Sequence, residues 1–182
     1  IVAELKAFLR ATGLEPPYVL CAHSIGGLFA RLYAHTYPEE IAGIVLIDTT
    51  HEDYWVRTAL ELDPQTVQKA NLSMGLAQTL VSQVGAMGEF YNAVNTTNEV
   101  RANRRLPEVP LIILSQDKDN FTSLSSTDTQ NSAALIFRQL YQEQARLVPN
   151  GVWRIIEDTG HLIQWEQPEA VAQAVRDVIQ GW

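Results

Sequence analysis

The chain has 182 residues, of which 46% are hydrophobic and 19% charged, a balance typical of a globular domain with a sizeable core. Its formal net charge of -8 argues against binding to nucleic acid or to an anionic membrane surface. Its apolar runs are far shorter than the ~20 residues of a membrane-spanning helix, and its N-terminal residues do not resemble a signal peptide. A single cysteine, Cys21, allows no internal disulfide and leaves the cellular compartment open, and its apolar surroundings predict a buried thiol.

Helix and strand patterns alternate along the chain. Helices are expected at residues 1–12, 25–37, 128–147 and 168–182, and strands at residues 18–22, 41–47, 109–115 and 152–156. Strands separated by helices predict an α/β fold with a parallel sheet and right-handed crossovers. Residues 52–106 contain no convincing strand. In this stretch Asp63-Pro64 is typical of a helix start, and Thr96-x-x-Glu99 resembles a capping box at another.

The first expected strand leads into the sequence AHSIGG and then into a helix. This order is typical of a nucleophile elbow, in which Ser24 lies on a sharp turn with positive φ. Gly26 and Gly27 are small enough for a close approach of strand and helix, and Ala22 stands where glycine is usual. The turn predicts Ser24 as a nucleophile and the Ile25 N–H as a donor to an oxyanion. The alternative is a glycine-rich packing turn with an idle serine.

A serine nucleophile needs a base, and the chain has four histidines. His161 follows the last expected strand and precedes the last helix, which makes it the candidate general base. His23, beside Ser24, is expected to pack at the elbow or to line the site. His35 is expected on a solvated helix face, and His51 in a loop that can border the site.

Three stretches carry a resemblance to a known family. They are AHSIGGLFARLYAHTYPEEIAGIVLIDTTHED, VPLIILS and RIIEDTGHLIQWEQPEAVAQAV, and together they resemble the α/β-hydrolase superfamily. The resemblance implies a hydrolase core formed by residues 1–51 and 107–182, with residues 52–106 inserted as a helical cap over the site. It also implies an esterase-like mechanism with a Ser–His–Asp triad.

The triad acid has two candidates that both keep the chain order Ser, Asp, His. Asp48 ends the second expected strand, and Asp119 lies in the loop after the third, where most of the superfamily carries its acid. The acid must accept the hydrogen bond from the imidazole Nδ1–H. The chain resembles a subgroup whose acid follows the second of these strands, which favours Asp48 and leaves Asp119 as the alternative.

The resemblance covers only the C-terminal part of the usual fold. In the superfamily further strands precede the elbow strand, and a loop after one of them supplies a second oxyanion donor. Here only the helix at residues 1–12 precedes that strand, so the sheet lacks the usual N-terminal strands and Ile25 is the single donor. We therefore expect a fragment or a truncated chain, in which a partner segment or a homo-oligomer completes the edge of the sheet.

The sequence therefore predicts a serine hydrolase that cleaves carboxylic esters, with no metal and no organic cofactor. Its substrate is expected to be a small-molecule ester with an apolar group, because residues 52–106 are rich in apolar side chains. These are Trp55, Leu60, Leu62, Met74, Leu76, Leu80, Met87 and Phe90. The alternative is a catalytically weak, hydrolase-like binding module, which an incomplete oxyanion hole would favour.

Overall fold

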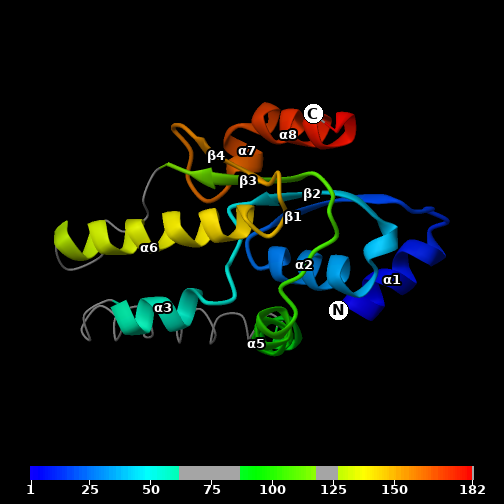
Figure 1. Ribbon diagram of the computed structural model, residues 1–182, viewed down its shortest axis with the longest axis horizontal. Helices are drawn as coiled ribbons and strands as arrows, with labels where there is room; N and C mark the ends of the chain where they lie inside the picture. Colours follow the sequence, from blue (N-terminus) through cyan, green and yellow to red (C-terminus); the bar gives the residue numbers. More distant parts are fainter. Residues whose placement is uncertain (62–86, 118–126, 182) are drawn as a thin grey trace.

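The computed structural model describes residues 1–61, 87–117 and 127–181 (Figure 1). Its sheet contains β1 (Tyr18–His23), β2 (Ile41–Ile47), β3 (Leu111–Gln116) and β4 (Val152–Ile156). All neighbouring strands are parallel, and they lie side by side in chain order, so β1 and β4 form the edges among the described residues. This arrangement confirms the predicted α/β fold class.

Helices cover both faces of the sheet. They are α1 (Val2–Ala11), α2 (Gly26–Thr36), α3 (Tyr54–Glu61), α5 (Met87–Ala102), α6 (Thr127–Ala145), α7 (Ile163–Glu166) and α8 (Pro168–Gln180), with a short 3-10 helix η1 (Pro38–Glu40). Figure 1 shows α7 and α8 on one face, α2 and α6 on the other, and α3 and α5 beyond them. Within the described ranges, no helix combines the length and the apolar character needed to cross a bilayer.

The central strand β2 explains why both faces are covered. Ile44 and Leu46 pack toward α2 and α6, whereas Val45 and Ile47 pack toward α8, and all four side chains are buried. Successive side chains of a strand point to opposite faces, so a strand between two helical layers must be apolar throughout. The uninterrupted run IAGIVLI meets that requirement.

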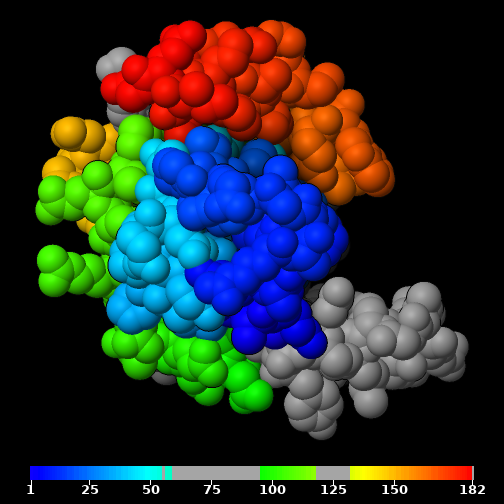
Figure 2. All heavy atoms as spheres, turned by 90° about the vertical axis from the view of Figure 1, so that its right-hand side faces the viewer, coloured from blue at the N-terminus to red at the C-terminus, as the bar shows by residue number. Residues whose placement is uncertain are grey.

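Two local predictions are wrong. Cys21 is exposed, because β1 is an edge strand, where helices packed on the sheet cover side chains less completely than on β2. Figure 2 shows the N-terminal residues, in blue, on the surface below the red helix α8. Thr96 does not start a helix, because it lies inside α5, which begins at Met87. Asp63-Pro64 lies outside the described residues.

The predicted cap is described at its two ends only. Its first helix, α3, packs on α6, and its last helix, α5, packs on α2. Residues 62–86 lie outside the described part of the chain, as do the side chains on which the apolar pocket was predicted. The division into a core and a cap therefore stays a prediction.

Candidate active site

Three segments of the core meet where the parallel strands end. Ser24 directly follows β1, Asp48 directly follows β2, and His161 lies in the loop after β4. The carboxyl ends of parallel strands share one edge of a sheet, which is where α/β folds place their sites. His161 Nε2 lies 3.1 Å from Ser24 Oγ, and His161 Nδ1 lies 2.6 Å from Asp48 Oδ2. Because a carboxylate only accepts, Nδ1 carries the proton, and Nε2 is free to accept the Ser24 O–H.

The turn at Ser24 has the strained backbone that the sequence predicts, with φ of 55°. The Ser24 N–H donates to the Ile47 carbonyl at 3.1 Å, and the Ser24 carbonyl accepts the Thr50 N–H at 3.1 Å. Both bonds tie the turn to the end of β2. Ile25 is the N-cap residue of α2, and no described residue accepts a hydrogen bond from its N–H. That N–H lies at the positive end of the helix dipole.

Only one of the two elbow glycines is required by close packing. A Cβ added to Gly27 would lie 2.5 Å from the Cβ of Thr49, so any larger residue would displace the loop after β2. At Gly26 the nearest atom is the Ala22 Cβ at 3.9 Å, an ordinary contact. Gly27 therefore lets α2 start close beneath the Asp48 loop, whereas Gly26 has room for a side chain.

Asp48 is nearly buried, with 4% of its surface exposed and φ of 45°. Its Oδ2 faces His161, while its Oδ1 accepts the Tyr141 hydroxyl at 2.7 Å and the Gln116 N–H at 3.2 Å. The alternative acid, Asp119, lies outside the described residues. The structure thus brings Asp48 into contact with His161, and its role as the acid stays a prediction.

The loop that carries His161 is held by a carboxylate that directly follows the neighbouring strand β3. Asp117 accepts the N–H groups of Asp158 at 2.8 Å and Thr159 at 3.0 Å, where the chain turns with a φ of 58° at Asp158. The His161 side chain is 42% exposed, although the side chain of its partner Asp48 is only 2% exposed. The imidazole therefore reaches the surface while its acid stays out of water.

The other three histidines have different surroundings. His23 packs on His161, with ring centroids 4.5 Å apart, and its Nε2–H donates to the His161 carbonyl at 2.8 Å. His35, on α2, is half-buried, and its Nδ1–H donates to the Arg105 carbonyl at 2.9 Å. His51 is buried and accepts the Asp53 N–H at Nδ1. Burial lowers the pKa of His51 and outweighs its carboxylate neighbours, so this imidazole is neutral.

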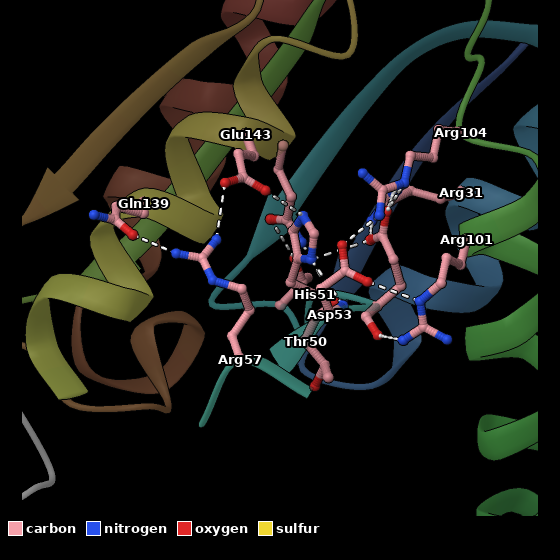
Figure 3. A network of polar contacts seen from close by, with 12 residues as sticks. Arg31, Thr50, His51, Asp53, Arg57, Arg101, Arg104, Gln139 and Glu143 are labelled. Carbon is pink, nitrogen blue, oxygen red and sulfur yellow. Dashed lines mark hydrogen bonds and ion pairs between the residues drawn. The ribbon is translucent and has the colours of Figure 1, made fainter. Parts of the chain in front are cut away.

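An ionic cluster with a buried centre and an exposed edge lies next to His51 (Figure 3). Arg31 of α2 donates to Glu52 through two bonds of 2.5 and 3.1 Å, and the side chains are 1% exposed. Arg104 lies 3.2 Å from Glu52 and also pairs with Asp53, which Arg101 contacts at 2.8 Å. Burial alone would raise the pKa of Glu52, but the bonds and charge of Arg31 hold it below its ordinary value.

Three neighbouring residues at this cluster are of types that commonly bind metal ions. Ligand atoms of His51, Glu52 and Asp53 lie within 4.8 Å of one another. Both carboxylates already contact guanidinium groups, and the His51 Nδ1 is used by the Asp53 N–H. We therefore describe these residues as an ion-paired cluster and not as an open set of ligands.

Sequence reasoning missed two residues that contact the site. Tyr141 lies within a predicted helix, and nothing in the local pattern distinguishes it from a core tyrosine. Asp117 stands in the loop sequence SQDKDN among several carboxylates. Its position directly after β3, at the edge where the strands end, is the signal that could have singled it out.

Comparison with known proteins agrees with this architecture. Residues 1–82 match a family model described as the alpha/beta hydrolase fold. The uncharacterised protein YqjL of Bacillus subtilis is 24% identical over 177 residues, which cover 97% of this chain and 62% of YqjL. The chain therefore spans less than two thirds of the length of that relative.

Two solved structures show the same fold. A probable hydrolytic enzyme from Pseudomonas aeruginosa PAO1 has a TM-score of 0.56 at 21% identity, over 99% of this chain and 67% of its own. A thermophilic esterase from Thermogutta terrifontis has a TM-score of 0.56 at 20% identity, over 98% of this chain and 70% of its own. The N-terminal part of the chain thus matches the alpha/beta hydrolase family model, and the chain shares the fold of these two structures.

Proposed function

We propose that the chain contains the active site of a serine hydrolase that cleaves carboxylic esters through an acyl-enzyme intermediate. The observation that carries this proposal is the hydrogen-bonded series from Ser24 Oγ through His161 to Asp48, with separations of 3.1 and 2.6 Å. A serine on a strained turn is activated when its hydroxyl contacts a base that in turn contacts an acid. A structural neighbour that is an esterase supports the choice of esters.

Acylation begins when Ser24 Oγ attacks the ester carbonyl carbon. His161 Nε2 takes the hydroxyl proton, and the resulting imidazolium faces the Asp48 carboxylate. The carbonyl oxygen becomes an oxyanion, which is proposed to accept a hydrogen bond from the Ile25 N–H at the start of α2.

The remaining steps move two protons through His161, first one from Ser24 and then one from water. The imidazolium of His161 gives the first proton to the leaving alkoxide oxygen as the C–O bond breaks, which releases the alcohol and leaves the acyl group on Ser24. His161 then takes a proton from a water molecule, whose oxygen attacks the acyl carbon. The bond between that carbon and Ser24 Oγ breaks as the imidazolium gives this proton to Oγ, which releases the carboxylic acid and restores the free serine. The apolar residues of the 52–106 segment are proposed to accept the apolar group of the ester.

Labelling with a fluorophosphonate probe followed by intact-mass measurement tests the nucleophile without knowledge of the substrate. The wild-type chain is expected to gain one probe, whereas Ser24→Ala and His161→Gln gain none. His35→Gln is the matched control, because it removes an imidazole that is remote from Ser24, and it should be labelled like the wild type.

The same variants extend the test to turnover. Ser24→Ala should lower kcat/KM for p-nitrophenyl esters by at least about 1,000-fold, with little change in Tm, because it removes the reacting oxygen and leaves the fold intact. Probe incorporation or ester turnover that persists in Ser24→Ala would exclude this serine as the nucleophile. A wild-type chain that takes up no probe would favour the binding module instead.

A further inference from the structure

The hydroxyl of Tyr141 contacts Asp48, the proposed triad acid, at the carboxylate oxygen that does not face His161. It donates to Asp48 Oδ1 at 2.7 Å, on the side of the carboxylate opposite to His161. Tyr141 comes from α6, far along the chain from the Asp48 loop, and it is buried. It therefore contacts the acid from the interior of the protein.

The donors to Asp48 are divided between its two oxygens. Oδ1 receives the Tyr141 hydroxyl and the Gln116 N–H, and both of these donors are uncharged. Oδ2 receives the His161 Nδ1–H alone among the described residues. With Oδ1 occupied in this way, rotation of the carboxylate would break two bonds, so Oδ2 stays directed at the imidazole.

The ring of Tyr141 is held in place by two other aromatic side chains. Its ring stacks on Trp153 of β4, with centroids 6.0 Å apart and an angle of 25° between the planes, and it also contacts Phe137 one turn earlier on α6. Burial, followed by the charge of Asp48, raises the pKa of Tyr141 well above its ordinary value. The phenol therefore keeps its proton and remains a donor at neutral pH.

We propose that Tyr141 is a positioning residue of the triad, which fixes the orientation of Asp48 and withdraws part of its negative charge from His161. The inference rests on the proposed function, because it assigns Asp48 as the triad acid. It adds a residue from α6 to a site that is otherwise formed by the ends of β1, β2 and β4.

Loss of the hydroxyl has two expected consequences. The carboxylate loses a donor that holds its orientation, so the imidazole is less well placed and kcat falls. The remaining negative charge is shared with fewer donors, so it stabilises the imidazolium more strongly. The protonation midpoint of His161 is therefore expected to rise, and the acid limb of the kcat/KM profile moves to higher pH with it.

Other titratable groups lie near the pair and are unchanged by this substitution. His23 packs on His161, Asp117 holds the His161 loop, and Tyr54 of α3 lies close enough to Tyr141 to affect its ionisation. A comparison of two proteins that differ only at Tyr141 cancels their contribution.

Tyr141→Phe tests the proposal, and Tyr33→Phe provides a matched control. Tyr33 is also a buried tyrosine that donates to a carboxylate at 2.7 Å, but its partner is Glu40, away from the triad. We expect Tyr141→Phe to lower kcat for a p-nitrophenyl ester by about 10-fold with KM nearly unchanged, a loss of about 1.4 kcal/mol in transition-state stabilisation. Tyr33→Phe should leave kcat and the pH profile at wild-type values even if it lowers Tm.

An NMR titration of the His161 imidazole gives a readout that does not depend on turnover, with His161→Gln used to assign its signal. A midpoint that rises in Tyr141→Phe and is unchanged in Tyr33→Phe supports the inference, even if the wild type hydrolyses no ester and the proposed function fails. If Ser24→Ala abolishes ester turnover, the proposed function holds. If Tyr141→Phe then has the kcat and the His161 midpoint of the wild type, the inference about Tyr141 is overturned. A midpoint that falls or stays constant overturns it in either case.

Discussion

Two carboxylates on the same loop after β2 have opposite environments. Asp48 is 4% exposed and Glu52 is 1% exposed, so both are buried as charged groups. Asp48 receives two uncharged donors and one imidazole, whereas Glu52 receives the guanidinium groups of Arg31 and Arg104. A permanent cation neutralises Glu52, while uncharged donors leave much of the Asp48 charge available for a proton on His161.

The two environments suit two different roles, a proposed catalytic role for Asp48 and a stabilising role for Glu52. The Asp48 site ends at a half-exposed imidazole on the surface, which in the proposed mechanism exchanges a proton with the substrate. The Glu52 cluster connects α2 with residues on both ends of the 52–106 segment, through Asp53 on one side and Arg101 and Arg104 on the other (Figure 3). Its charges are paired with one another, so it can hold the segment in place but offers no free acid or base.

The largest expected effect on stability comes from breaking the ionic cluster. Glu52→Gln leaves the Arg31 guanidinium, with a side chain that is 1% exposed, without its anionic partner. Removing one member of a buried ion pair costs about 3–5 kcal/mol, and we expect a loss near the lower value, measured by urea unfolding at pH 7.

The control for that variant is an exposed pair. Glu169→Gln removes a contact between Glu169 and Arg176 on the surface of α8, where both side chains are largely in water. Such pairs contribute only about 0–1 kcal/mol. If Glu52→Gln unfolds at the same urea concentration as the wild type, the cluster does not anchor the segment.

A smaller effect is expected when pH is used to weaken the same cluster. Because Arg31 holds the pKa of Glu52 below its unfolded value of 4.5, the ionised carboxylate contributes stability that is fully present above pH 4.5. That contribution is lost as the pH falls through the lowered pKa of the folded state. Each unit of pKa difference corresponds to about 1.4 kcal/mol.

Urea unfolding between pH 7 and pH 3 checks this prediction. The wild type should lose stability below pH 4.5 more steeply than Glu52→Gln, so that the difference between the two proteins narrows with acid. A constant difference across this range would show that Glu52 keeps its ordinary pKa. Asp53, whose pKa is also lowered, adds a loss of stability in acid to both proteins.

The sequence alone predicts those strands and turns whose structure is determined by residues close together in the chain. The strand at residues 41–47 and the strand at residues 152–156 have the bounds predicted, because both are short stretches rich in β-branched residues between helical patterns. The positive φ of Ser24 also follows from local sequence, since a strand, a sharp turn and a helix must meet there. These features depend on near neighbours in the chain.

The features that depend on distant neighbours are not visible in the sequence. Tyr141 reaches Asp48 only because α6 crosses the sheet with that face toward β2, and Arg31 meets Glu52 only through the packing of α2 under the loop. Neither pair has a sequence signature, because a buried tyrosine or arginine has the same local pattern wherever its partner lies. The exposure of Cys21 has the same origin, because it depends on β1 being an edge strand.

The smallest effect on activity is expected at His23, whose imidazole contacts His161 of the proposed triad but is not part of it. His23→Phe keeps a ring against His161 but removes the Nε2–H that donates to the His161 carbonyl at 2.8 Å. An uncharged hydrogen bond contributes about 0.5–1.5 kcal/mol, so kcat should fall by about 2-fold to 10-fold while KM and the pH profile stay nearly constant.

The control for His23→Phe is His35→Phe, which removes an equivalent imidazole-to-carbonyl bond, of 2.9 Å to Arg105, away from the site. If both variants lose stability but only His23→Phe loses kcat, the His161 loop needs this support for its geometry. Equal activities in the two variants would mean that Asp117, which holds the N–H groups of Asp158 and Thr159, is enough to fix the loop. In that event His23 belongs with the Glu52 cluster, as a residue that stabilises the fold and does not set the position of the proton.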